Sequence, residues 1–391
     1  MNKLILKPGR DKSLKRRHPW IFSGAVARID GSPASGETVE ILASSGEFLA
    51  LAAYSPQSQI LARVWDWKRR EISARFFEER VAQALDLRLD MTAPALRLIH
   101  AESDGLPGTI VDRYAGTVVL QLSSAGAMRW RDAIIEALQN RVQPLAIVER
   151  SDADVMALEG LRPSVGVLRG SVKEPVFIEE DSLEFEIDLL GGHKTGFYLD
   201  QRVNRARLRT MAHGRDVLDC FCYSGGFALN AVAAGARSVT AVDSSSAAIG
   251  LLQRNLARNR MSGVECMEGD VFEVLRKMRD QSRRFDLIIL DPPKFAPTAA
   301  HVQRAARAYK DINLLAFKLL RPCGLLFTFS CSGGVERGLF QKIVAGAALD
   351  AGVEAQIVEY LSASPDHPVA LNFPEGEYLK GLLCRIAGGA L

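Results

Sequence analysis

The chain has 391 residues, of which 48% are hydrophobic and 24% are charged, and its formal net charge is only +3. This composition is typical of a folded protein of two or three domains; no apolar stretch is long enough to span a membrane, and we expect no signal peptide. The six cysteines have neither the spacing of a disulfide framework nor that of a zinc site, so we expect no metal and a cytoplasmic protein.

Residues 1–75 have the pattern of a small β-barrel with a basic surface. Short strand-like segments alternate with Gly, Ser and Pro turns at Lys3–Lys7, Ala25–Ile29, Thr38–Leu42, Phe48–Tyr54 and Ile60–Trp65. The segment carries 13 Lys and Arg against 7 Asp and Glu, and the cations Lys12, Lys15, Arg16 and Arg17 precede the aromatic Trp20 and Phe22. This favours docking to RNA phosphates. The alternative is that the charges only solubilise the surface while the two aromatics belong to the barrel core.

Residues 76–185 have the pattern of a small α+β domain. Apolar positions at helical spacing predict a helix over Ile72–Leu89. We then expect a hairpin of Thr109–Asp112 and Val118–Leu122, a helix over Met128–Asn140 and a strand over Ala146–Arg150.

From residue 186 to residue 391 strands and helices alternate, which is typical of a parallel sheet. The predicted strands are Asp216–Cys220, Ser238–Asp243, Val264–Glu268, Asp286–Asp291, Gly324–Ser330, Gln356–Leu361 and Tyr378–Ile386. The predicted helices are Phe227–Ala234, Ser246–Arg258, Val271–Met278, Ala305–Leu320 and Gly338–Ala351. Only a loop, Pro365–Glu377, precedes the seventh strand, so that strand must return antiparallel. Seven strands in this arrangement predict the Rossmann-like sheet of a class I methyltransferase.

Acidic residues follow three successive strands of this sheet. Asp219 precedes a glycine turn that contains Phe221, Tyr223 and Gly225, with Tyr223 where methyltransferases usually have a glycine. Asp243 ends the next strand 24 positions later, about where a carboxylate meets an adenosine ribose, and Asp270 follows the third strand. A strand-end turn at Asp243 and a helix N-cap at Asp270 are the structural alternatives. Together the three acids predict a bound adenosine cofactor.

A polar and aromatic segment lies upstream of the first strand of the sheet. Phe197 and Tyr198 could line an adenine or sulfonium surface, and Arg202 could hold a carboxylate. The alternative is a loop that enters a helix over Gln201–Met211 with Asp200 as its N-cap.

Two further segments predict the reacting site. Asp291 opens the sequence Asp-Pro-Pro-Lys-Phe, in which Lys294 replaces the aromatic residue that amine methyltransferases carry after Asp-Pro-Pro. Cys331 follows the fifth strand, beside a Gly-Gly turn. Methylation of carbon 5 of a pyrimidine requires a nucleophile such as a thiolate, because carbon 5 becomes nucleophilic only after the thiolate has added to carbon 6. The alternative is that Cys331 is a small buried hydrophobe.

The chain resembles the bacterial family of large-subunit ribosomal RNA cytosine-C5 methyltransferases that carry an N-terminal PUA domain. The segments that carry the resemblance are Lys15–Gly24, Ser103–Gly108, Thr195–Arg202, Val217–Phe227, Leu290–Phe295, Ser330–Ser332 and Asn372–Lys380. The resemblance implies S-adenosylmethionine as methyl donor, a cytosine of large-subunit rRNA as acceptor, and Cys331 as the cysteine of the sixth methyltransferase motif. The second cysteine of many such enzymes is missing at Pro293-Lys294, so Asp291 and Lys294 are only candidates for the base.

Two other functions stay open at this point. A related family with Asp-Pro-Pro methylates a guanine nitrogen, and an RNA-binding assembly factor could retain a vestigial methyltransferase fold, as the altered glycine loop at Tyr223 suggests. A nicotinamide dehydrogenase is disfavoured because the chain lacks a dinucleotide fingerprint. The sequence does not decide whether the protein is a homodimer.

Overall fold

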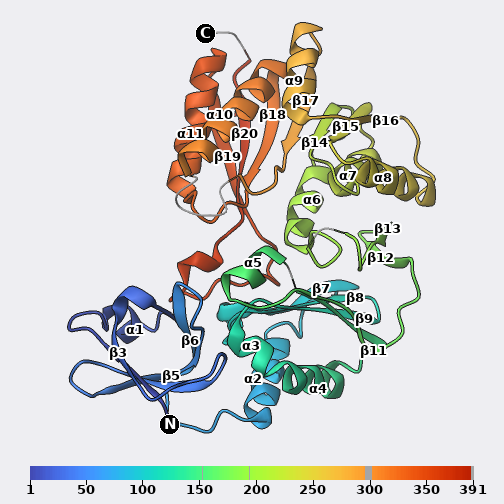
Figure 1. Ribbon diagram of the computed structural model, residues 1–391. Helices are drawn as coiled ribbons and strands as arrows, with labels where there is room; N and C mark the ends of the chain where they lie inside the picture. The colour runs from blue at the N-terminus through green and yellow to red at the C-terminus, as the bar shows by residue number, and fades with distance from the viewer. Residues whose placement is uncertain (152, 193, 296–301, 389–391) are drawn as a thin grey trace. The chain divides into compact units, whose positions relative to one another are not determined.

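The computed structural model describes residues 1–151, 153–192, 194–295 and 302–388. The chain forms two compact units (Figure 1). The first comprises Met1–Ile178, Ile187–Leu199 and Pro365–Gly376, and the second comprises Glu179–Glu186, Asp200–Ser364 and Glu377–Leu391. The predicted domain boundaries at residues 75 and 185 stay predictions.

The first unit begins with a six-stranded sheet in the order β2-β6-β5-β4-β1-β3. Its strands are β1 (Lys3–Leu6), β2 (Trp20–Phe22), β3 (Val26–Asp30), β4 (Thr38–Leu42), β5 (Phe48–Tyr54) and β6 (Ile60–Asp66), with the short helices α1 (Lys12–Lys15) and η1 (Ser23–Ala25). Alternate apolar residues of the strands, together with Leu14 of α1, form its core. The five predicted strands match β1 and β3 to β6 to within one residue at each end, whereas the three-residue β2 was not predicted.

A five-stranded sheet in the order β11-β10-β9-β8-β7 follows in the same unit. It consists of β7 (Ala95–His100), β8 (Thr109–Tyr114), β9 (Thr117–Leu122), β10 (Ala146–Ser151) and β11 (Ser164–Gly170). The associated helices are α2 (Ala74–Asp86), η2 (Ala101–Asp104), α3 (Ala125–Arg129), α4 (Arg131–Val142) and α5 (Ala153–Leu158). Phe76 and Phe77 of α2 and Ile134 and Leu138 of α4 share one core cluster with the strands.

Two predictions for this region were wrong in detail. The single helix expected over Met128–Asn140 is two helices, α3 and α4, which are separated by Trp130 with its non-helical φ of −100° and ψ of 15°. The hydroxyl of Ser124 caps the start of α3 by accepting from the amide of Ala127. The helix expected to extend to Leu89 ends at Asp86, and the Leu89 side chain is exposed.

The next two strands along the chain, β12 (Val176–Glu180) and β13 (Leu183–Ile187), form a two-stranded sheet. The short helix η3 (Leu199–Gln201) follows, and α6 (Arg202–Arg209) comes directly after it. Gln201 is the N-cap residue of α6, so Asp200 does not cap this helix.

The second unit is built on a seven-stranded sheet in the order β16-β15-β14-β17-β18-β20-β19. The strands are β14 (Asp216–Cys220), β15 (Ser238–Asp243), β16 (Val264–Glu268), β17 (Phe285–Leu290), β18 (Leu320–Ser330), β19 (Ala355–Ser362) and β20 (Lys380–Ile386). Its helices besides α6 are α7 (Gly226–Ala233), α8 (Ser246–Arg258), α9 (Val271–Asp280), α10 (Val302–Leu319) and α11 (Arg337–Ala351). β20 pairs antiparallel with both β18 and β19, which confirms the predicted class I methyltransferase topology.

The two faces of this sheet are covered by different helices (Figure 1). Side chains of α9, α10 and α11 form one core with Leu218, Cys220 and Leu290 of the strands. Asp219 lies between Leu218 and Cys220 and so points to the opposite face, because successive side chains of a strand alternate. On that face α7 packs on β14 and β15, and α6 packs on α7.

Over the described ranges of the chain, no helix combines the length and the apolar character needed to cross a membrane.

Candidate active site

The candidate residues of the second unit gather at one edge of its sheet. The strands β14, β15, β16, β17 and β18 are parallel to one another, so their carboxyl ends meet at the same edge. Asp219, Asp243, Asp270, Asp291 and Cys331 all lie at or just after those ends. In an open α/β sheet this edge is where ligands bind.

The loop from β14 to α7 has an unusual backbone. Phe221 and Tyr223 have φ of +61° and +48°, and Gly225 has φ of +86°. These values lie in the left-handed region, which favours glycine. Tyr223 therefore has a backbone conformation that a glycine would adopt more easily. Gly225 itself cannot be replaced cheaply, because an added Cβ would lie 2.2 Å from Cδ1 of Leu252.

Asp219 is the most deeply buried carboxylate of this edge, with 1% of its surface exposed. Its Oδ2 accepts from the amide of Ala228 at 3.0 Å, whereas its Oδ1 has no hydrogen-bond partner among the described residues. Burial raises the pKa of Asp219 well above its usual range, and the nearby charges of Asp291 and Asp243 raise it further. An orphaned acceptor beside two more carboxylates is suited to a ligand that supplies N–H and O–H donors.

Asp243 organises the loops around it. Its Oδ2 accepts from the amide of Tyr223 at 2.9 Å, and its Oδ1 accepts from the amide of Ser245 at 3.0 Å. Its backbone carbonyl accepts from the amide of Gly269 at 2.9 Å. Asp243 thus fixes the glycine turn on one side and the loop before Asp270 on the other. Asp243 therefore has the structural role of a strand-end turn, and this role does not exclude a contact with a ligand.

Asp270 is the N-cap residue of α9. Its Oδ1 accepts from the amide of Glu273 at 3.1 Å, and the side chain is exposed. The helix N-cap that the sequence offered as the alternative role of Asp270 is therefore present, and a contact with an adenine would be made in addition to it.

The four candidates upstream of β14 fall into two groups. Phe197 and Tyr198 belong to the first unit, where the hydroxyl of Tyr114 accepts from the amide of Phe197 at 3.2 Å and Lys194 lies 4.2 Å from the centre of the Tyr198 ring. Asp200 and Arg202 belong to the second unit. There Asp200 is 2% exposed and its Oδ2 accepts from the hydroxyl of Tyr378 at 2.7 Å.

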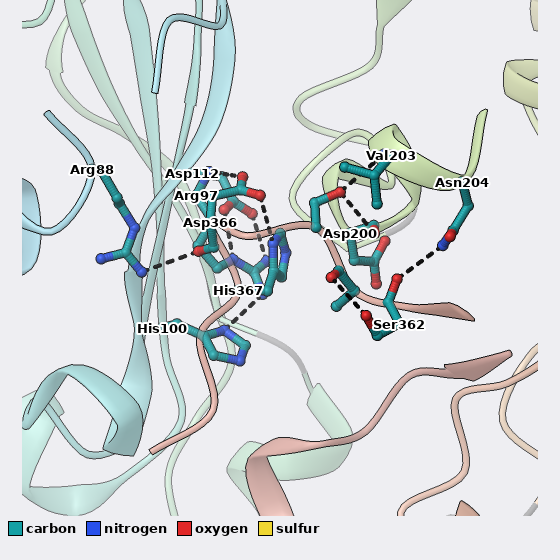
Figure 2. Close-up of polar contacts among 12 residues, drawn as sticks. Arg88, Arg97, His100, Asp112, Asp200, Val203, Asn204, Ser362, Asp366 and His367 are labelled. Carbon is teal, nitrogen blue, oxygen red and sulfur yellow. Dashed lines mark hydrogen bonds and ion pairs between the residues drawn. The ribbon is translucent and has the colours of Figure 1, made fainter. Parts of the chain in front are cut away.

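The start of α6 is tied to the end of β19 (Figure 2). The backbone carbonyl of Asp200 accepts from the Ser364 hydroxyl at 3.0 Å, and the side-chain amide of Asn204 donates to the carbonyl of Ser362 at 3.0 Å. These bonds fix the backbone that carries Asp200 and Arg202.

The Asp-Pro-Pro loop after β17 has an aromatic ring that faces the core. Asp291 is half-buried and Lys294 is exposed. The Phe295 ring packs at 4.8 Å from the Tyr309 ring and 6.0 Å from the Phe272 ring, measured between centroids. Phe295 is therefore committed to packing within the described part of the second unit.

Cys331 lies directly after β18 and beside the Asp-Pro-Pro loop. Its thiol is half-buried and donates to the carbonyl oxygen of Pro292, with a distance of 3.6 Å from Sγ to O. The next residue, Ser332, is held through its hydroxyl, which is 3.0 Å from the hydroxyl of Tyr309. Burial raises the pKa of Tyr309 to about 12, and the charge of Cys331 contributes in the same direction. The structure thus brings the Cys331 thiol and the Asp291–Lys294 loop together.

Lys380 is a residue of this neighbourhood that sequence reasoning missed. It is 2% exposed, and its ammonium donates to the carbonyl of Ser332 at 2.9 Å. No feature of the sequence identified it, because a lysine at the start of a strand is by default expected to be exposed.

A buried polar network in the first unit was also missed (Figure 2). Arg97 makes two bonds of 2.8 Å to the carboxylate of Asp112, and its amide donates to Asp366 at 2.9 Å. Arg88 donates to the backbone carbonyl of Asp366 at 3.1 Å. Ion pairs between charged residues far apart in sequence leave no local pattern, so no feature of the sequence identified them.

The four cations proposed to dock RNA lie at α1 and just after it, and all are exposed. Lys15 forms ion pairs of 2.7 Å with Asp11 and 3.3 Å with Glu47, and the guanidinium of Arg17 lies 5.1 Å from the centre of the Trp67 ring. Of the aromatics, Phe22 is 48% exposed and so is not a core residue. Trp20 is half-buried, and its indole donates to Glu102 at 2.7 Å.

Comparison with known proteins agrees with this geometry. Residues 4–67 match the family model of a PUA-like domain, and residues 155–381 match that of an S-adenosylmethionine-dependent methyltransferase. The protein named ribosomal RNA large subunit methyltransferase I from Shewanella frigidimarina is 48% identical over 98% of this chain and 99% of its own length. The protein of the same name from Klebsiella pneumoniae is 48% identical over 98% of both chains.

Solved structures show the same fold. The structure of SMU.776, described as a putative methyltransferase complexed with SAH, matches with a TM-score of 0.87 at 22% identity. The match covers 98% of this chain and 100% of that of SMU.776. Given the 48% identity along almost its entire length, the chain, which combines a PUA-like domain with an S-adenosylmethionine-dependent methyltransferase domain, belongs to the ribosomal RNA large subunit methyltransferase I family.

Proposed function

We propose that this protein methylates carbon 5 of a cytosine in large-subunit ribosomal RNA, with Cys331 as the covalent nucleophile. The observation that carries the proposal is the half-buried thiol of Cys331 at the carboxyl edge of the sheet, 3.6 Å from the Pro292 carbonyl of the Asp-Pro-Pro loop. The names of the curated relatives support ribosomal RNA as the acceptor.

The carboxylates of the same edge fit the cofactor of this family. Oδ1 of Asp219 is a buried acceptor for which the described residues supply no hydrogen-bond donor, and Asp243 ends the neighbouring strand, as the acceptor of a ribose does in doubly wound folds. We assign to the cofactor site of the second unit Asp200, Arg202, Asp219, Phe221, Tyr223, Gly225, Asp243, Asp270 and Asp291, whereas cofactor contacts by Phe197 and Tyr198 stay a prediction from the sequence. When bound there, S-adenosylmethionine supplies a methyl group made electrophilic by its sulfonium.

The role of Cys331 follows from the chemistry of the acceptor. Its thiolate adds to carbon 6 of cytosine, a C–S bond forms, and the electron pair of the former double bond makes carbon 5 nucleophilic. After carbon 5 has gained the methyl group it carries both that group and its original proton. Removal of this proton restores the double bond and expels the Cys331 thiolate unchanged.

The base that removes the proton is one of two residues of the Asp-Pro-Pro loop. Asp291 is half-buried and its charge acts on both Asp219 and Tyr309, so it lies between the cofactor side and the Cys331 side of the site. Lys294 is exposed, and its charge acts on Lys380. We propose Asp291 as the first candidate, because a general base must be deprotonated and must lie within reach of the proton that it removes.

Methylation of a guanine nitrogen is less consistent with this site. That chemistry uses an aromatic ring after Asp-Pro-Pro to stack the target base, and it needs no thiol. Here Lys294 stands at that position, and the Phe295 ring packs on Tyr309 and Phe272. The Cys331 thiol beside the loop would then have no chemical role.

The cations Lys12, Lys15, Arg16 and Arg17 are proposed to contact RNA phosphates. All four are exposed, and among the described residues Lys12 and Arg16 form no ion pair, whereas Lys15 pairs with Asp11 and Glu47. Cations that are not neutralised within the protein release counterions when they meet phosphates, which drives binding.

Nucleoside analysis of a defined reaction tests this proposal. Large-subunit rRNA and intact large subunits from cells that lack the protein are incubated with the purified chain and S-adenosylmethionine, and the product nucleosides are identified by mass spectrometry. The proposal predicts 5-methylcytidine with the wild type and none with Cys331→Ala, which should bind the cofactor normally. A methylguanosine product, or full activity in Cys331→Ala, would refute it.

A further inference from the structure

Lys380 is a buried cation at the start of β20, beside the residue proposed as nucleophile. Only 2% of its surface is exposed, although an unpaired ammonium in such a position is strongly destabilising. Its ammonium donates to the backbone carbonyl of Ser332 at 2.9 Å. One neutral carbonyl does not compensate a buried charge fully, so a partner of negative charge is expected nearby.

The register of the sheet determines what that partner is. β18 and β20 pair antiparallel, with Ser330 opposite Lys380. The Lys380 backbone is thus opposite the residue before Cys331, and its side chain reaches the carbonyl of the residue after Cys331. The cysteine lies between the two points that Lys380 contacts.

The charged groups around Lys380 come from α11 and from three loops of the second unit. Burial is the main cause that lowers the pKa of Lys380, and the charges of Arg337 and Lys294 lower it further. The charges of Cys331 and Glu377 raise it, and the contribution of Cys331 is the larger of the two. On the side of the cysteine, the charges of Cys331 and Asp291 both act on Tyr309. Electrostatic coupling is reciprocal, so an ammonium that is favoured by a thiolate favours that thiolate equally.

We propose that Lys380 is a positioning residue for the reaction: its ammonium, anchored on the Ser332 carbonyl, stabilises the thiolate form of Cys331. The inference rests on the proposed function only in that Cys331 is the nucleophile. It assigns to Lys380 no contact with the RNA or the cofactor.

The alkylation rate of Cys331 tests the proposal without any methyl transfer. The full-length protein is treated with iodoacetamide between pH 6 and pH 10.5, and the modified Cys331 peptide is quantified by mass spectrometry, apart from that of the exposed Cys323. Lys380→Gln keeps a donor for the Ser332 carbonyl but has no charge, and Lys380→Arg keeps both. Lys380→Met removes both, and Lys342→Met removes an exposed lysine of α11 as the matched control.

The proposal predicts that Lys380→Gln and Lys380→Met are alkylated at least about tenfold more slowly than the wild type at pH 7, because the thiolate is the reactive form. The rates should converge with that of the wild type near pH 10.5, where the thiol is ionised in every variant. Lys380→Arg should stay within about threefold of the wild type, and Lys342→Met should be unchanged. Calorimetric binding of S-adenosylmethionine verifies that each variant is folded.

A wild-type pH profile in Lys380→Gln would overturn the proposal, because the hydrogen bond without the charge would then suffice. A uniform slowing at every pH would also overturn it, since that pattern reports altered access. Because Gln and Arg both retain a donor, their comparison decides the matter even if the Met variant does not fold. Full methylation by Cys331→Ala would refute the covalent function and leave the alkylation result intact, so the two failures are distinguishable.

Discussion

Arg97 and Asp112 form a bidentate ion pair in the interior of the first unit, with two nitrogen–oxygen distances of 2.8 Å. The pair holds two segments that are far apart in the sequence. Oδ2 of Asp112 also accepts from the hydroxyl of Thr195, and the amide of Arg97 donates to Asp366. Thr195 begins the segment that leads to Asp200, and Asp366 lies in the connection that leads to β20 and Lys380.

Replacing Arg97 by Met should lower the free energy of unfolding by about 3 kcal/mol, because it leaves the Asp112 carboxylate buried without its cation. The matched control is Arg75→Met, since the Arg75 side chain is 85% exposed in its pair with Glu79. The control should cost less than about 1 kcal/mol. Urea denaturation followed by tryptophan fluorescence measures the free energy of unfolding of both variants. Equal losses in the two variants would show that the buried pair stabilises the fold no more than an exposed pair does.

Asp216 should make stability depend on pH in the acid range. Hydrogen bonds from Arg237 are the main reason why the pKa of Asp216 lies well below its usual range. The folded protein therefore holds this group ionised more strongly than the unfolded chain does, so its contribution is present above about pH 4 and is lost as the pH falls further. Asp216→Asn should cost about 1 kcal/mol at pH 7, and the difference from the wild type should shrink below pH 4.

Thermal denaturation between pH 2.5 and pH 7 follows this change, with Asp280→Asn as the control because Asp280 is exposed near the end of α9. A difference between Asp216→Asn and the wild type that is constant over this range would contradict the assignment.

Asp243→Ala should weaken the binding of S-adenosylmethionine at least about tenfold, because a hydrogen bond to a charged group contributes about 1.5–3 kcal/mol. The variant also releases the amides of Tyr223 and Ser245, which shape the glycine turn. Isothermal titration calorimetry gives the affinity, and Asp280→Ala serves as the control. Wild-type affinity in Asp243→Ala would remove this residue from the cofactor site.

The sheet of the second unit could be predicted almost completely, because buried parallel strands and amphipathic helices leave strong periodic patterns. The antiparallel β20 followed from a single observation, the loop over Pro365–Glu377 in place of a helix. The carboxylates and Cys331 could be located as well, since a residue at the end of a parallel strand lies at the functional edge whatever the details of its packing.

What could not be predicted depends on contacts between distant parts of the chain. The short β2 is stabilised by pairing with β6 and has too few residues for a periodic pattern. The break at Trp130, which ends α3 and precedes α4, falls inside a segment whose apolar spacing is helical throughout, so the pattern gave no sign of it. The burial of Lys380 and of the pair of Arg97 with Asp112 becomes visible only when the sheets are assembled, because a charged residue in the sequence is by default an exposed one.

Reversing the charges of Arg16 and Arg17 to Glu should weaken binding of large-subunit rRNA and flatten its dependence on salt, because fewer counterions are released. The affinity for S-adenosylmethionine should stay the same. Filter binding at several salt concentrations measures this, with Arg75→Glu and Arg28→Glu combined as a control of equal charge change on exposed residues of the same unit. Equal losses in the two double variants would show a general effect of net charge without a docking surface at α1.

The most direct test of the central claim is a covalent trap. Fluorine at carbon 5 cannot leave as a proton does, so an rRNA transcript made with 5-fluorocytidine should stay bonded to the nucleophile after methyl transfer. The transcript is one whose unfluorinated form the wild type methylates, and the complexes are separated on a denaturing gel and mapped by peptide mass spectrometry. The account predicts an adduct at Cys331 that requires S-adenosylmethionine and is absent in Cys331→Ala. An adduct at another residue, or methylation of the unfluorinated transcript by Cys331→Ala at the wild-type rate, would contradict it.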